Sequence, residues 1–198
     1  MLIFTQNLLV FLSFVIFIQQ NNSQFDLFFV YGHQKYNYKV SSKEAISDLI
    51  KSTDDAIQKY STHSSNKFQK LMRNGKKSVK NHEVTVHNEQ TKNVISMVPD
   101  GGNIKSLPEE YWNIRKYNKA FQRMNSKLPS NTIDTGHRNY FHYEANRIPT
   151  ARESARIQSF PDSFEFIGAK GSQYKQVGNA VPPLLAKALA VKIKSYLK

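Results

Sequence analysis

Two adjacent prolines, Pro182 and Pro183, fix the backbone near the end of this 198-residue chain. Proline is tolerated in the first turn of a helix, where its missing N–H would have had no intrahelical partner anyway. Leu185, Leu189 and Ile193 follow at helical spacing, with lysines nearly opposite. The pair therefore predicts a C-terminal amphipathic helix that begins at the prolines and packs its apolar stripe on a core.

Gly178 and Asn179 stand just before these prolines. Glycine permits a backbone conformation, or a close approach of another segment, that a side chain would block. Taken alone, the pair is a turn that leads into the helix. A loop constrained on both sides could also hold a small ligand against backbone groups, so both interpretations stay open.

A short and sharply delimited helix is predicted upstream of this loop. Thr150 and Glu153 form a T-x-x-E capping box, in which each side chain bonds the backbone N–H of the other residue. The helix has to end before Pro161, and it carries Arg152 and Arg156 on one face.

The rest of the chain gives weaker local signals. The sequence FDLFFVYG at 25–32 predicts a buried strand, and Ser42 is the predicted N-cap of a short helix. Residues 74–77 and 99–103 have turn composition, and EVTVH at 83–87 is a candidate short strand.

Charge and cysteine content limit the possible functions. The formal net charge is +13, and residues 61–130 hold 13 basic against 5 acidic residues. Such a surface favours a nucleic acid as partner, although solubility or an anionic membrane would also explain it. The chain contains no cysteine, which excludes disulfides, thiolate metal sites and cysteine nucleophiles. We expect no metal.

The apolar segment at residues 1–24 allows three interpretations. It is a strand region that needs a partner, sequence read out of frame, or a signal or anchor. No basic residue precedes its apolar run, and the run is shorter than the roughly 20 apolar residues that a membrane-spanning helix needs. We expect the protein to be cytoplasmic and associated with the nucleoid.

The two C-terminal blocks carry a family resemblance. RIPTARESARIQSFPD at 147–162, followed by GSQYKQVGNAVPPLLAKALA at 171–190, closely resembles the last two shared motifs of DNA cytosine-5 methyltransferases. FQRMNSKLPSNTID at 121–134 is similar to the end of the target recognition region of that family. The resemblance implies an α/β fold, namely the C-terminal portion of an S-adenosyl-L-methionine-dependent methyltransferase, with an irregular, mixed recognition lobe.

The resemblance also implies a domain division. Residues 1–24 keep an uncertain status, residues 25–50 are the end of the catalytic-domain portion, and residues 51–146 are the target recognition region. Residues 147–198 hold the C-terminal motifs and the helix that packs back on the catalytic domain.

Site residues follow from the same resemblance. Asn179, Ala180 and Val181 are expected to line the S-adenosylmethionine pocket. Thr132 matches a threonine expected at the DNA backbone, where a hydroxyl can donate to a phosphate oxygen. Further predicted contacts to duplex DNA are Arg147, Arg152, His82, Arg73, Lys76 and Lys77.

These basic side chains have a structural alternative. The arginines of the predicted helix region can pair inside the protein with Glu153, Asp162 or Glu165. A lone histidine such as His82 also need not contact DNA.

The family chemistry requires a cysteine thiolate that adds to cytosine C6, so no catalytic residue is expected in this chain. One hypothesis is a split methyltransferase, linked to restriction-modification and completed by a subunit that carries the cysteine. A second is an inactive fragment of an interrupted gene. A third is a non-enzymatic basic protein that binds DNA or is tethered to a membrane.

Overall fold

The computed structural model describes residues 39–51, 57–112, 121–135 and 140–196. The predictions for residues 1–24 and for a strand at 25–32 lie outside these residues. The chain divides into two units, one of Lys39–Lys187 and one of Met1–Tyr38 with Ala188–Lys198. Among the described residues, no helix has the length and apolar character to cross a membrane.

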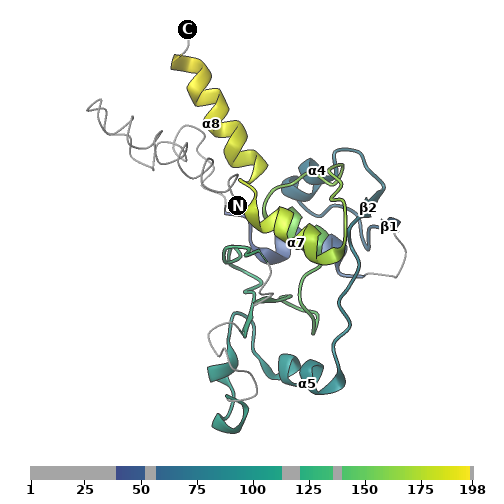
Figure 1. The fold of residues 1–198 in the computed structure, drawn as a ribbon, viewed down its shortest axis with the longest axis vertical. Helices are drawn as coiled ribbons and strands as arrows, with labels where there is room; N and C mark the ends of the chain where they lie inside the picture. Colours follow the sequence, from purple (N-terminus) through teal and green to yellow (C-terminus); the bar gives the residue numbers. More distant parts are fainter. Residues whose placement is uncertain (1–38, 52–56, 113–120, 136–139, 197–198) are drawn as a thin grey trace, which may run out of the picture. The chain divides into compact units, whose positions relative to one another are not determined.

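The first part of the Lys39–Lys187 unit combines short helices with a small sheet (Figure 1). Strands β1 and β2 pair antiparallel, with Gln58 opposite Val79. The elements are α3 (Ser42–Ile46), the 3-10 turn η1 (Ser47–Leu49), β1 (Ile57–Lys59), α4 (Lys67–Arg73) and β2 (Ser78–Lys80).

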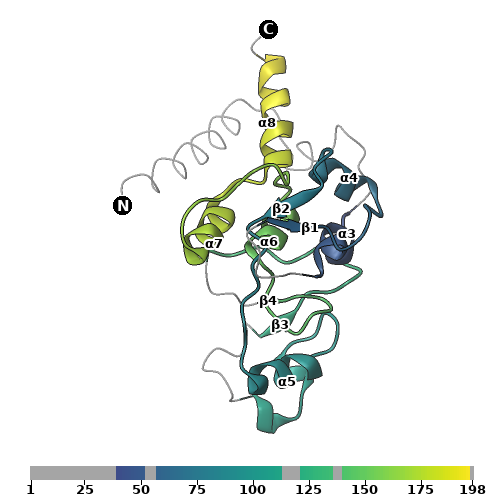
Figure 2. The same cartoon turned by 90° about the vertical axis from the view of Figure 1, so that its right-hand side faces the viewer.

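The middle part is less regular and has α5 at its far end, away from α4 and α7 in both views (Figures 1 and 2). Asn88 caps α5 by accepting a hydrogen bond from the Thr91 N–H. Strands β3 and β4 form a parallel pair. The elements are α5 (Glu89–Met97), η2 (Ile104–Ser106), η3 (Glu109–Tyr111), β3 (Gln122–Arg123) and β4 (Tyr140–Phe141).

Three helices follow, α6 (Ala151–Ile157), α7 (Lys170–Asn179) and α8 (Pro183–Tyr196). The capping box of Thr150 and Glu153 is confirmed, and α6 ends before Pro161 as predicted. Helix α8 begins at Pro183, as the prolines predicted. The docking of α8 on a catalytic domain stays a prediction.

Three apolar clusters form the core of the Lys39–Lys187 unit. The first joins α5 to β3 and β4, where the rings of Phe121 and Phe141 meet edge to face, with centroids 4.4 Å apart. The second surrounds Ile46 of α3, and the third surrounds Ala155 of α6 and Val177 of α7. Ile133 packs against both the second and the third cluster.

The turns at 74–77 and 99–103 are confirmed. Asn74 and Gly75 have φ angles of 42° and 81°, and Gly101 has a φ of 72°. This left-handed region of the backbone favours glycine and asparagine, which explains the composition of both segments.

Three local predictions were wrong. The N-cap of α3 is Ser41 rather than Ser42, because only the 41–44 frame gives a serine whose hydroxyl accepts from the Glu44 N–H while Glu44 accepts from the serine N–H. Residues 83–87 form no strand. The strand in this part of the chain is β2 at Ser78–Lys80, which pairs with β1. Gly178 and Asn179 form the last turn of α7 rather than a separate turn.

Candidate functional site

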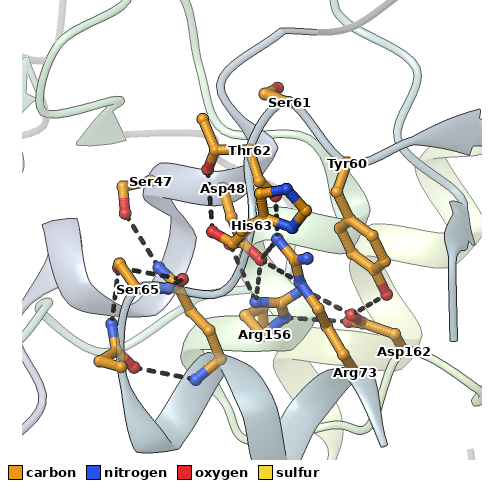
Figure 3. Close-up of polar contacts among 12 residues, drawn as sticks. Ser47, Asp48, Tyr60, Ser61, Thr62, His63, Ser65, Arg73, Arg156 and Asp162 are labelled. Atoms are coloured by element: carbon orange, nitrogen blue, oxygen red, sulfur yellow. Dashed lines mark hydrogen bonds and ion pairs between the residues drawn. The ribbon is translucent and has the colours of Figure 1, made fainter. Parts of the chain in front are cut away.

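Helix α6 holds a buried cation, Arg156, between two carboxylates (Figure 3). Its Nε and Nη2 donate to the two oxygens of Asp162 at 2.9 and 2.5 Å. Its Nη1 donates to Asp48 at 3.1 Å and to the Ala45 carbonyl at 3.3 Å. Because both carboxylates are buried with it, Arg156 ties α6 to the α3–η1 segment and to the loop after α6.

Two further side chains extend this ionic cluster toward α4 and β1. The Nε of Arg73 donates to Asp48 at 2.7 Å, and its guanidinium lies 3.7 Å above the centre of the Tyr60 ring. The Tyr60 hydroxyl donates to Asp162 at 2.6 Å, and burial together with this bond raises the pKa of Tyr60. Arg73 also donates to the Thr62 carbonyl at 2.6 Å, so it anchors the loop after β1.

A second ion pair, between the buried Glu153 and the partly exposed Arg147, stands at the start of α6. Arg147 donates to both oxygens of Glu153 in a bidentate pair, at 2.7 and 2.8 Å. Burial alone would raise the pKa of Glu153, but the charge and hydrogen bonds of Arg147 outweigh it and lower that pKa to about 2. Glu153 also accepts from the Thr150 N–H at 2.8 Å, which completes the capping box.

Two buried histidines flank this pair. Nδ1 of His142 accepts from the N–H groups of Glu144 and Ala145, so the ring proton of the neutral imidazole belongs on Nε2, which lies 3.7 Å from Glu153. Burial lowers the pKa of His142 to about 4. His82 contacts the Thr150 hydroxyl at 2.8 Å, and burial lowers its pKa as well.

Arg152 is fully buried and bonds mainly to backbone carbonyls. It donates to Lys80 at 2.9 Å and to Pro161 and Phe164, and its Nη2 also reaches the Asn81 side chain at 3.3 Å. It therefore fastens α6 to the end of β2 and to the loop after α6.

These contacts favour the structural alternative for most of the predicted DNA-contacting residues. Internal pairing is confirmed for Arg147 with Glu153, whereas Glu165 pairs with Lys80 rather than with an arginine. Arg152 and His82 have almost no exposed surface, which disfavours direct contact with a phosphate in this conformation.

Other predicted DNA-contacting residues do face solvent. Lys76 and Lys77 are exposed on the turn between α4 and β2, and Thr132 is exposed in the segment before Asp134. Arg73 is different, since its side chain is only 13% exposed and is engaged by Asp48.

The predicted cofactor residues lie at the C-terminal end of α7. Asn179 and Val181 are exposed and Ala180 is half-buried against the third cluster. The helix is anchored by Val177, which is fully buried, and by Tyr174, whose hydroxyl donates to the Pro149 carbonyl at 2.6 Å.

The three residues can supply one amide side chain and one apolar contact. That set can form one wall of a pocket for S-adenosylmethionine, while the other contacts have to come from elsewhere. In the part of the chain that the structure describes, no group of three or more histidine or acidic side chains could hold a metal ion.

Sequence reasoning missed several residues of these networks. Asp48, Tyr60 and His142 were not singled out. Asp48 contacts Arg156 across 108 residues and Tyr60 contacts Asp162 across 102, and no local sequence pattern marks contacts of that separation. Arg123 was also missed. It is buried and donates to the carbonyls of Val98 and His142, so it holds the end of α5 against β4.

Comparisons with known proteins agree with the sequence resemblance. Residues 14–195 match the family described as C-5 cytosine-specific DNA methylase. A crystal structure from E. coli, of a protein described as a DNA modification methyltransferase encoded within a prophage, has a TM-score of 0.63 at 20% identity. That likeness covers 80% of this chain and 47% of the other, and it supports the mixed α/β fold.

The curated relatives are Type II methyltransferases. The chain is 43% identical over 123 residues to M1.HphI of Haemophilus parahaemolyticus, covering 62% of this chain and 33% of that protein. It is 36% identical over 180 residues to M.DdeI of Desulfomicrobium norvegicum, covering 80% and 43% respectively. The chain thus spans about a third to under half of the length of these two relatives.

A shorter relative differs in coverage. M.AquIB of Picosynechococcus sp. is 34% identical over 131 residues, and the alignment covers 60% of this chain but 90% of that protein. The family match over residues 14–195 and this near-complete coverage of a relative lead to one conclusion. The chain belongs to the C-5 cytosine-specific DNA methylase family.

Proposed function

We propose that this chain is the DNA-recognition and cofactor-wall portion of a DNA cytosine-5 methyltransferase of a Type II restriction-modification system. It acts with a second chain that carries the catalytic cysteine and most of the S-adenosylmethionine site. The observation that carries this proposal is the coverage of M.AquIB, a relative short enough to lie almost wholly within the match to this chain. A chain of this short length therefore carries the name of a Type II methyltransferase.

The DNA side of the proposal rests on the exposed residues of the recognition region. Lys76 and Lys77 present two ammonium groups on one turn, and the Thr132 hydroxyl faces solvent in a separate segment. Such groups position a duplex through its phosphates and carry no sequence information themselves. Arg147 and Arg152 act indirectly in this proposal, by holding α6 and the loops around it.

The cofactor side rests on the end of α7. Asn179, the last residue of α7, and Val181, two residues beyond it, are exposed, and the helix itself is anchored in the core. We assign them to one wall of the S-adenosylmethionine pocket, with Ala180 behind them. When bound, the cofactor supplies the methyl group, and this chain contributes binding and orientation only.

Exposed apolar side chains near the two C-terminal motifs support a partner chain. Phe164 is 47% exposed, Ile167 81%, Val181 53% and Leu184 40%. They border the third cluster, since the Phe164 ring packs against Phe160 and the Leu184 N–H donates to the Ser159 hydroxyl. We propose that the cysteine-bearing chain covers these side chains, because burial of such apolar surface drives association.

Co-expression tests the proposal. This chain, with an affinity tag, is produced together with the product of the reading frame that precedes it, and the purified material is tested for methyl transfer from radiolabelled S-adenosylmethionine to duplex DNA. Two chains should co-purify, and activity should need both. Retention of this chain alone, or no transfer by the pair, would contradict the proposal.

A pair of matched variants locates the interface. Ile167→Lys places a charge on a side chain that is 81% exposed, so it should leave folding intact and reduce co-purification at least tenfold. Leu71→Lys on α4, at 54% exposure, is the control and should leave co-purification unchanged. Equal behaviour of the two variants would argue against this surface.

A further inference from the structure

Gly178 lies where the last turn of α7 meets another segment of backbone. A Cβ atom at this position would stand 2.5 Å from the carbonyl oxygen of Asp134, 2.6 Å from its carbonyl carbon and 2.7 Å from the N of Thr135. Carbon atoms in contact prefer separations of about 3.5–4.0 Å, so any side chain here needs a displacement of about 1 Å. The atoms that it would meet are all backbone, which has no rotamer to change.

Both sides of this contact are anchored. Ile133, the neighbour of Asp134, packs against the second and the third apolar cluster. On the other side, Val177 is fully buried in the third cluster and Tyr174 bonds the Pro149 carbonyl. Close-packed interiors transmit such a displacement instead of absorbing it. A side chain at Gly178 would therefore separate the two segments.

The two segments carry residues that the proposed function assigns to different ligands. Thr132 stands two residues before Asp134 and faces solvent on the segment proposed to contact DNA. Asn179 follows Gly178 directly and is exposed at the proposed cofactor wall. One backbone contact thus lies between the two sites.

We infer that Gly178 is a positioning residue that joins residues 131–135 and the end of α7 into one rigid piece. This piece holds the DNA-backbone contact at a fixed place relative to the cofactor wall. The inference rests on the proposed function for the roles of the two ends, while the rigid junction itself depends only on the packing.

The junction is tested without DNA or cofactor. The chain has no cysteine, so Thr132→Cys with Asn179→Cys gives two unique attachment points for spin labels at exposed positions. Asn179 adjoins Gly178 and Thr132 lies two residues from Asp134, so the labels are close together, and dipolar broadening in continuous-wave electron paramagnetic resonance of the frozen protein should report one narrow distance distribution between them. Adding Gly178→Ala should shift the distribution or at least double its width.

Gly171→Ala is the matched control. Gly171 belongs to the same helix, and a Cβ there meets nothing within 4 Å, so this variant should leave the distribution unchanged. A Gly178→Ala distribution that coincides with the Gly171→Ala one would overturn the inference. If circular dichroism shows that Gly178→Ala does not fold, the labelled pair with Gly178 intact decides: one narrow peak supports a rigid junction, and a broad or double peak overturns it.

Duplex binding then tests what the junction does. Fluorescence anisotropy with a labelled duplex should show that Thr132→Ala weakens binding about fivefold, as expected for loss of one hydrogen bond of about 1 kcal/mol. Gly178→Ala should weaken binding similarly, yet add nothing in a chain that already carries Thr132→Ala. Losses that multiply would overturn the positioning role. Absence of duplex binding by the unsubstituted chain would instead refute the proposed DNA role and leave the spin-label result to decide the junction.

Discussion

Replacing Arg156 by methionine tests whether the buried ionic cluster holds the recognition region to the C-terminal motifs. The Arg156→Met variant keeps an unbranched side chain but removes the cation that five hydrogen bonds connect to Asp162, Asp48 and Ala45. The carboxylates of Asp48 and Asp162 would then stay buried without the positive charge of Arg156 to balance them. Breaking a buried ion pair from one side typically costs about 3–5 kcal/mol. For a chain of this size, that is a fall in Tm of roughly 6–20 °C.

The assay is urea unfolding followed by the fluorescence of the single tryptophan, Trp112. The control is Lys92→Met, which removes an exposed partner of Glu89 on α5 and should cost below about 1 kcal/mol. Adding Asp162→Asn to Arg156→Met should cost less than Asp162→Asn alone, because the two residues act as a pair. A loss for Arg156→Met no larger than that of the control would refute the role of the cluster.

Three further outcomes are expected. Lowering the pH from 7 to 4 should reduce the free energy of unfolding by roughly 3 kcal/mol, because unfolded histidine takes up a proton below about pH 6.5 while burial holds the pKa of His142 near 4. Between pH 4.5 and about 2 the stability conferred by Glu153, whose pKa is lowered to about 2, should be lost as well. Urea titrations at several pH values measure both losses, and a free energy of unfolding that stays constant over either pH range would contradict the corresponding assignment. Lys76→Gln together with Lys77→Gln should weaken duplex binding and reduce the salt slope of log K by about 2, whereas an unchanged slope would argue against phosphate contacts. Thr150→Ala should destabilise the chain by at least about 1 kcal/mol in thermal melts, since it removes the cap of α6, and no change in Tm would mean that the cap is not needed.

The parts of the structure that could be predicted are set by local chemistry. The capping box of Thr150 and Glu153 is an interaction between residues three positions apart, so a segment of four residues is enough to predict it. Pro183 favours the start of α8 because its ring fixes the φ angle and its backbone has no N–H to leave unpaired in the first turn. Gly178 indicated a close approach, although only the structure identified the backbone of Asp134 and Thr135 as the neighbour.

The parts that could not be predicted depend on distant contacts. Arg156 reaches Asp48 across 108 residues, and His82 reaches Thr150 across 68. Nothing in the sequence around His82 distinguishes a buried histidine from a surface one. Strand β2 has three residues and one buried side chain, so its pattern is too short to identify, and the more alternating 83–87 segment was chosen in error.

Burial also separates two classes among the basic residues that were predicted to contact DNA. Lys76 and Arg152 look equally suited to DNA from sequence alone. Arg152 is fully buried against backbone carbonyls, whereas Lys76 is exposed on a turn. A planar guanidinium with several donors suits such internal bonding, while a lysine is more easily left in solvent.

The most direct test of the account is the 5-methylcytosine content of cellular DNA. Cells that lack other cytosine-5 methyltransferases would express this chain alone, the product of the preceding reading frame alone, or both together. We predict 5-methylcytosine at one short recurring duplex sequence only when both chains are present. Methylation by this chain alone would contradict the requirement for a cysteine that it does not contain, and its absence with both chains would contradict the proposal of a two-chain enzyme.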